Sequence, residues 1–198
     1  INVADYEENR HFFLSRYFRN QYDRWMQKLP NLVTGVTINR VEIWVTNKTG
    51  TTANTRNIVA LTDLGETSKI SNPMWTATGQ VSSNSANTEY QAMTTQYVAA
   101  RDIDQAAATL EGAGLVGGAD FEKLESARLL SSSEYSVNTA LGYVSLKTGI
   151  QTDQVLAVAY EYTSGGVTYQ VGEFASDITD TKQALFVKAL KNTSCNPQ

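Results

Sequence analysis

Two neighbouring stretches decide the fold class expected for this chain: Arg40-Val-Glu-Ile-Trp-Val-Thr-Asn-Lys-Thr-Gly50 and Arg56-Asn-Ile-Val-Ala-Leu61. In the first stretch, β-branched residues occupy every second position from Val41 to Val45, and Trp44 belongs to the opposite face. The second stretch continues the alternation. A period of two with high β-branched content predicts an antiparallel pair of half-buried strands over residues 36–46 and 57–63. Trp44 is then expected on the exposed face of this pair.

The composition limits the classes of protein to which the chain can belong. Its 198 residues suffice for one domain or two small ones, and they can bury a core without disulfide bonds. The single cysteine, Cys195, excludes a disulfide framework within the chain. The net charge of −4, with dispersed Lys and Arg, disfavours nucleic acid as a partner. No apolar stretch approaches the roughly 20 residues of a membrane-spanning helix. We expect a soluble fragment of a longer polypeptide.

The N-terminal region predicts one long amphipathic helix over residues 7–29, with Asp5 and Glu8 as a capping box and Pro30 just beyond its end. Its apolar stripe consists of Leu14, Phe18, Tyr22, Trp25 and Leu29. Residues 66–97 are rich in Ser, Asn and Thr and are expected to form a long loop, pinned at its few large apolar residues.

The second half of the chain is predicted to be mainly β-structure. A short helix over residues 103–111, capped by Asp102, precedes the strand candidates 122–130, 134–137 and 142–146. The strongest hairpin joins Val155–Tyr162 to Val167–Phe174, and its first arm is apolar on both faces, which is typical of a central strand. Residues 185–190 fit either a strand or a helix.

Together these elements predict an α+β fold: an antiparallel or mixed β-sheet, a long N-terminal helix packed on one face, and a C-terminal β-hairpin. A single domain is expected over residues 5–191, followed by a tail over residues 192–198.

The sequence offers little to a catalytic, cofactor or metal site. His11 is the only histidine, so any Ser-His-Asp or Cys-His site would have to use it, and a zinc site would lack ligands. Asp177 and Asp180 could bind a hard cation weakly but are first expected to be solvated turn residues. The glycine-rich segment 112–118 has the wrong context for a phosphate loop. We therefore expect no enzyme activity, cofactor or metal.

Two functions stay open on the residues alone. Ten tyrosines and three tryptophans could form a stacking surface for a cell-surface adhesion or glycan-binding module, with Trp44 and Trp75 as its first candidates. A hydrolase that uses scattered carboxylates or His11 is the second function.

An ordered series of motifs resembles the SprA/Sov family, the giant outer-membrane translocon of the type IX secretion and gliding-motility system of Bacteroidetes. The series covers residues 6–66 and 98–190, and the loop at 67–97 lies outside it. Its motifs are Asn9-Arg-His-Phe-Phe-Leu14, Tyr17-Phe-Arg19, Arg40–Gly50, Arg56–Ala60, Asp63-Leu-Gly-Glu66, Asp120-Phe-Glu-Lys123, Ser126-Ala-Arg-Leu-Leu-Ser131, Leu141-Gly-Tyr143, Leu156-Ala-Val-Ala-Tyr-Glu-Tyr162, Tyr169-Gln-Val-Gly-Glu-Phe174 and Leu185-Phe-Val-Lys188.

The resemblance implies a soluble, non-catalytic domain of a protein-export channel that caps, gates or braces the pore or docks partner subunits. The implied partners are other parts of the parent β-barrel, secretion-system subunits and secreted cargo proteins. The implied location is the outer membrane, with the extracellular face preferred to the periplasmic face. Because exposed loops on a rigid scaffold often carry contacts, the expected partner surface consists of Trp44, Asn47, Lys48 and Trp75.

Overall fold

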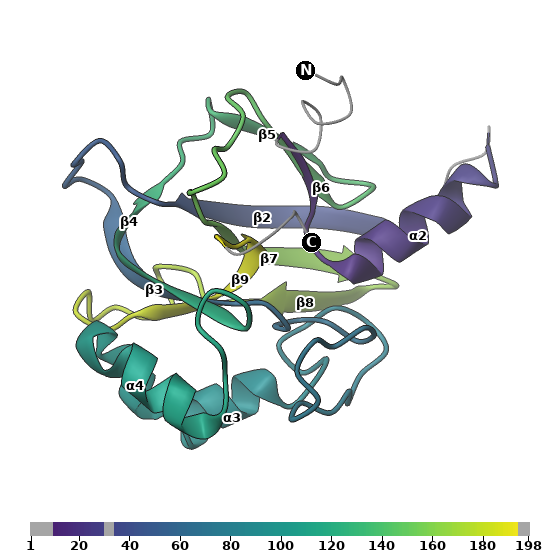
Figure 1. Ribbon diagram of the computed structural model, residues 1–198. Helices are drawn as coiled ribbons and strands as arrows, with labels where there is room; N and C mark the ends of the chain where they lie inside the picture. The colour runs from purple at the N-terminus through teal and green to yellow at the C-terminus, as the bar shows by residue number, and fades with distance from the viewer. Residues whose placement is uncertain (1–9, 30–33, 194–198) are drawn as a thin grey trace.

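A closed ring of five strands lies at the centre of the computed structural model, which describes residues 10–29 and 34–193 (Figure 1). The strands are β2 (Val36–Val45), β3 (Thr55–Leu61), β4 (Phe121–Leu129), β7 (Leu156–Ser164) and β9 (Leu185–Lys191). Their order around the ring is β2-β4-β3-β9-β7, and pairing of β7 with β2 closes it. Only β3 and β9 run parallel. A sixth strand, β8 (Val167–Val171), pairs with β7 outside the ring.

The barrel strands supply the interior with alanine and aliphatic side chains and one large ring. One buried cluster draws on all five barrel strands and on none of the helices, which identifies it as the interior. Its strand residues are Trp44, Ile58, Ala60, Ala127, Ala157, Ala159, Leu185, Val187 and Ala189. A ring of five strands is narrow, because the diameter of a barrel grows with its strand number. Alanine at five of these positions leaves room for the indole of Trp44.

The outer face of the barrel is also apolar, and two groups of elements cover it. Helices α3 (Glu89–Thr95) and α4 (Ile103–Ala113), joined by the short 3-10 helix η1 (Val98–Arg101), lie along its lower side in Figure 1. A three-stranded sheet lies above, and helix α2 (Arg16–Met26) lies at one end. The sheet consists of β1 (His11–Phe13), β6 (Tyr143–Leu146) and β5 (Tyr135–Asn138). Among the described residues, no helix is long and apolar enough to cross a lipid bilayer.

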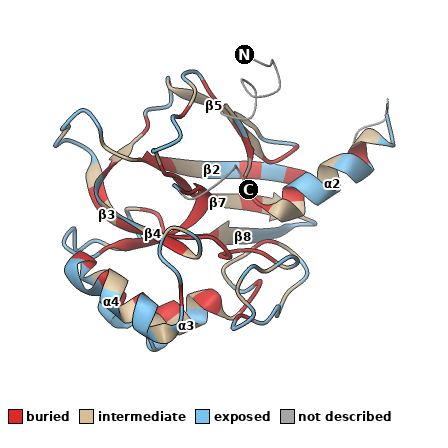
Figure 2. Ribbon diagram, in the orientation of Figure 1, coloured by how far each residue is buried: buried red, intermediate tan, exposed pale blue. Residues whose placement is uncertain are grey.

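The expected α+β fold is wrong, because the chain is mainly β-structure built on a closed barrel. Sequence alternation identified strands but carried no information on whether the sheet closes on itself. The predicted pair of strands at 155–162 and 167–174 does form, because β7 and β8 pair antiparallel, but this pair does not end the fold. Strand β9 follows β8 and inserts between β3 and β7 (Figure 1), and it is buried along its whole length (Figure 2). The two leading stretches are not paired directly either, because β4 lies between β2 and β3.

The expected long N-terminal helix is also wrong, and only its middle part is helical. His11–Phe13 forms strand β1, which pairs antiparallel with β6. Ser15 then caps α2 by accepting a hydrogen bond from the backbone N–H of Phe18 at 3.4 Å. The consecutive aromatic residues therefore mark a strand that ends in a helix cap, rather than a helix buried all round. The predicted capping box and Pro30 lie outside the described residues.

Several other predicted elements are confirmed. Asp102 caps α4, and Gly114 ends this helix in the left-handed conformation. The strand candidates at 122–130, 134–137 and 142–146 correspond to β4, β5 and β6, and residues 185–190 belong to strand β9. Strand β7 is covered on both faces as expected, because its residues belong alternately to the interior and outer clusters.

The segment 66–97 is ordered by hydrogen bonds to the barrel and contains helix α3. Asn87 donates to the backbone carbonyls of Asp63 and Glu66, at 2.7 and 2.9 Å. The hydroxyl of Ser82 lies 2.7 Å from that of Tyr160. The abundant Ser and Asn side chains thus replace the ladder hydrogen bonds that this irregular backbone lacks.

Enlarging an interior alanine tests the narrow barrel. We expect Ala157→Leu to lower the free energy of unfolding by about 1–3 kcal/mol, because the interior has no room for three further carbons. The same change at exposed Ala140 is the matched control and should change stability by less than about 0.5 kcal/mol. Urea unfolding followed by tryptophan fluorescence measures both, and equal effects would contradict a tightly filled interior.

Candidate functional site

Two of the four expected partner-surface residues cannot offer their side chains to a partner. Trp44 lies inside the barrel with 1% of its surface exposed, and Trp75, within the 66–97 segment, is 6% exposed and packs into the outer apolar cluster. The expectation that Trp44 is exposed is wrong, because closure of the sheet turned its solvent-facing side into the interior. Trp25 is buried as well, so all three tryptophans serve the core. This removes the rings that the glycan-binding hypothesis proposed first.

The other two residues, Asn47 and Lys48, lie at an exposed end of the barrel. The side-chain amide of Asn47 donates to Thr51 O at 2.7 Å and Ser126 O at 3.1 Å, which ties the loop between β2 and β3 to β4. The ammonium of Lys48 lies 2.6 Å from the carboxylate of Asp153. These contacts give the exposed loop a defined shape, as a docking surface requires.

The residues considered for catalysis have other roles. His11 is exposed on β1, where its Nδ1 atom lies 2.7 Å from the Ser145 hydroxyl on β6. No carboxylate among the described residues bonds this imidazole, so the pair lacks the third member that orients a catalytic histidine.

The two aspartates considered for cation binding stabilise turns. Asp177 accepts hydrogen bonds from Phe174 N and from the side-chain amide of Gln170, and Asp180 accepts one from Lys182 N. Within residues 10–29 and 34–193, no cluster of three or more His, Cys, Asp or Glu side chains is placed to hold a metal ion.

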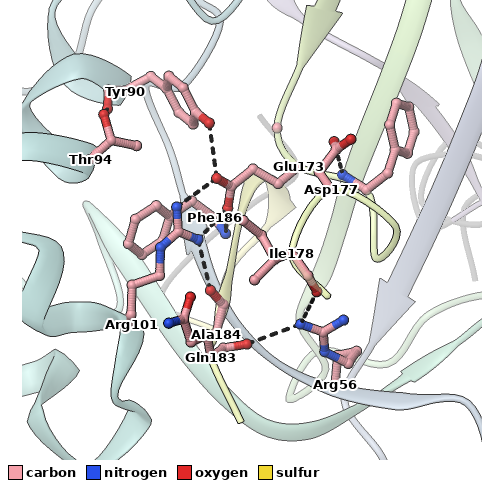
Figure 3. A network of polar contacts seen from close by, with 12 residues as sticks. Arg56, Tyr90, Thr94, Arg101, Glu173, Asp177, Ile178, Gln183, Ala184 and Phe186 are labelled. Atoms are coloured by element: carbon pink, nitrogen blue, oxygen red, sulfur yellow. Dashed lines mark hydrogen bonds and ion pairs between the residues drawn. The ribbon is translucent and has the colours of Figure 1, made fainter. Parts of the chain in front are cut away.

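The most extensive polar network centres on Glu173, which lies just after β8 (Figure 3). Its carboxylate accepts hydrogen bonds from both terminal nitrogens of Arg101, at 2.6 and 2.7 Å. Tyr90 OH donates to it at 2.9 Å and Phe186 N at 2.7 Å. Burial and the neighbouring carboxylate raise the pKa of Tyr90, so this hydroxyl keeps its proton.

This network joins three separate parts of the fold. Tyr90 comes from α3, Arg101 from η1, and Glu173 from the segment between β8 and β9. The guanidinium of Arg101 also lies 3.9 Å from the ring centroid of Phe186 on β9. With both carboxylate oxygens bonded and only 3% of the side chain exposed, Glu173 has no free lone-pair direction for a substrate. Its role is to hold the helices against the barrel.

Arg56, at the start of β3, holds the connection between β8 and β9 (Figure 3). Its guanidinium donates to four backbone carbonyls between β8 and β9, at 3.0 to 3.3 Å. These belong to Ala175, Ile178, Asp180 and Gln183. Five donors in a fixed plane suit this task, which lysine could not perform. Arg56 opens one of the quoted strand motifs, but only the folded chain shows which carbonyls it reaches.

A second set of buried charges fixes the 66–97 segment. Lys188 on β9 pairs with Glu66 at 3.2 Å, and both side chains are almost fully buried. Asp63 accepts hydrogen bonds from Ser71 N and Asn72 N, at 2.7 and 2.9 Å. Glu89, at the start of α3, is fully buried, and neither of its carboxyl oxygens has a hydrogen-bond partner among the described residues.

Burial without a hydrogen-bond partner favours the neutral acid at Glu89. Burial is the main cause that raises the pKa of Glu89 well above its ordinary value, and the Asp63 charge adds to this rise. Lys188 opposes the rise but is already paired with Glu66.

No protein-family model and no curated protein sequence matches this chain. The fold by itself assigns no function either, because function depends on sites rather than on architecture.

Removing Arg101 should be far more costly than removing an exposed arginine with similar contacts. Arg101→Met leaves the Glu173 charge buried without its partner, so we expect a loss of about 3–5 kcal/mol in the free energy of unfolding. The control is Arg40→Met: Arg40 also pairs with a carboxylate, Glu42, and lies 4.0 Å over the Phe174 ring, but it is 46% exposed. We expect about 0–1 kcal/mol there. Chemical unfolding measures both, and similar losses would contradict a structural role for the buried pair.

Glu89 should make stability fall with rising pH. Because its pKa is higher in the folded than in the unfolded state, its contribution is fully present below the unfolded value near 4.5 and is lost as the pH rises towards the folded value. Glu89→Gln should flatten this fall and stabilise the protein at pH 7 by about 1–3 kcal/mol. Unfolding curves from pH 4 to 8 test this, with exposed Glu125→Gln as the control. A variant less stable than wild type at pH 7 would show that Glu89 is buried as a carboxylate.

Proposed function

We propose that this chain is a non-catalytic domain of a protein-export channel of the SprA/Sov type, and that it braces the channel or docks a partner through the exposed loop Lys48–Asn54. The observation that carries the proposal is the ordered series of motifs that resembles this family. In the structure, these motifs supply parts of all five barrel strands. The resemblance thus covers the residues that specify this particular barrel.

The buried polar residues support a scaffolding role. Arg101 pairs with Glu173, and Arg56 binds backbone carbonyls between β8 and β9, so these side chains hold the fold rather than line an accessible site. The Lys48–Asn54 loop, by contrast, projects from the end of the barrel and is held by Asn47 and by the Lys48–Asp153 pair. A rigid barrel that presents one shaped loop has the form of a docking module.

Deleting residues 5–191 from the parent protein tests this proposal in cells. We expect the remaining protein to reach the outer membrane, measured by immunoblot of membrane fractions, and secreted cargo in the medium to fall at least tenfold. The control carries the same engineered junctions around the intact segment and should secrete normally. Normal secretion from the deletion strain would overturn the proposed role in export.

A narrower change separates docking from bracing. Replacing Lys48–Ala53 by a Ser/Gly sequence of equal length leaves Asn47, Asn54 and every barrel strand in place. If the loop docks a partner, secretion should fall several-fold while thermal unfolding of the domain stays nearly unchanged. Unchanged secretion from this variant would assign the role to the barrel as a brace and not to the loop.

A further inference from the structure

A cleft of about 260 Å³ opens between the end of the barrel and the three-stranded sheet. Its apolar lining consists of Val45 at the end of β2, Leu130 after β4, Leu146 at the end of β6, and Ile150 in the following loop. Each of these side chains is 5–9% exposed. The cleft thus has an aliphatic floor supplied by three separate segments of the chain.

The walls of the cleft are fixed by hydrogen bonds. Leu130 N donates to Ile43 O at 2.9 Å, and Lys147 N donates to Glu134 O at 3.0 Å. On the far wall, the ammonium of Lys191 donates to Gln154 O at 2.7 Å. A cleft whose walls are held in this way exists before any partner arrives, which lowers the entropic cost of binding.

The charged side chains at the rim of the cleft, Arg128, Glu134 and Lys147, sum to one positive charge. Arg128 donates to both oxygens of Glu134, at 2.9 and 3.1 Å, and Ser131 N donates to the same carboxylate. Burial alone would raise the pKa of Glu134, but these bonds together lower it, so the Arg128–Glu134 pair is neutral overall. Lys147 is exposed at the rim and makes no ion pair with any described residue. One positive charge remains beside the aliphatic floor.

The size of the cleft favours one large side chain over a complete small-molecule ligand. Typical ligand pockets occupy about 300–1,000 Å³, whereas protein interfaces often bury a single aromatic or aliphatic anchor in a smaller pocket. The cleft also shares the segment 151–154 with the proposed docking end, because Asp153 and Gln151 bind Lys48 while Gln154 lines the cleft.

We propose that this cleft binds an acidic polypeptide segment of a partner, which inserts one aromatic or branched aliphatic side chain onto the floor and places a neighbouring carboxylate at Lys147. The inference rests on the proposed docking function and names the chemistry of the partner. Apolar burial supplies most of the affinity, and the charge selects acidic neighbours of the anchor.

The experiment uses the chain itself and three capped tetrapeptides as probes: acetyl-Gly-Phe-Glu-Gly-amide, its Phe-to-Ala analogue and its Glu-to-Gln analogue. Binding is followed by the backbone amide shifts of the protein in two-dimensional NMR. We expect the first peptide to shift amides around Leu146–Ile150 and Ser133–Glu134. Replacing Phe by Ala should weaken binding about 10-fold or more, and replacing Glu by Gln about 3- to 5-fold.

Variants of the protein test the charge separately from the fold. Lys147→Glu should weaken the acidic peptide about 5- to 10-fold and remove its advantage over the Gln analogue. Lys182→Glu is the matched control, because Lys182 is also exposed but lies on the turn before β9, and it should leave binding unchanged. Added salt should reduce the difference between the acidic and neutral peptides.

Three outcomes would overturn the inference: no shifts at the cleft up to millimolar peptide, equal binding of the Phe and Ala peptides, or tighter binding of free 3-phenylpropionate than of the acidic peptide. The last would identify a small-molecule carboxylate site instead. Failure here is distinguishable from failure of the proposed function. Loss of secretion on deletion without peptide binding refutes only the cleft, and peptide binding with normal secretion on deletion refutes only the role in export.

Discussion

Closure of the sheet into a ring of five strands is the constraint on which the rest of this structure depends. The pairing of β2 with β7 leaves a narrow interior that accepts alanine at most inward positions and one indole ring, that of Trp44. A core of this size buries little apolar surface per strand. The outward faces of the same strands must therefore also be buried, which explains why β7 is apolar on both faces.

The covering elements are joined to the barrel by buried charges as well as by apolar contacts. The Arg101–Glu173 pair attaches η1 and α3, the Lys188–Glu66 pair attaches the 66–97 segment, and Arg56 attaches the connection between β8 and β9. Buried ion pairs add little net stability, but they strongly penalise any arrangement that separates the partners. They thus fix where each covering segment lies, which apolar contact alone would specify loosely.

This structural use of charged side chains also bears on function. Several charged side chains that could serve catalysis, among them Asp177, Asp180 and Glu173, hold turns or covering segments in place. The two features proposed here for contact with a partner lie at one end of the barrel. The shaped loop around Lys48 and the cleft beside Lys147 lie at this end, joined by the segment 151–154. A scaffold that carries a shaped loop and a cleft at the same end is suited to contact with another protein. Both the proposed docking role and the proposed acidic partner depend on this end.

By itself, the sequence determined the local structure: the alternation in β2, the Asp102 cap of α4, and the apolar character of β7 follow from periodicity and capping, which act over a few residues. Only the tertiary structure decided that the sheet closes, that β9 inserts between β3 and β7, and that Trp44 points inwards. Strand alternation assigns residues to two faces, but which face is enclosed depends on pairing between distant segments. The partners of Arg56 and Glu173 and the burial of Glu89 were hidden for the same reason, because burial and ion pairing arise between segments far apart in the chain.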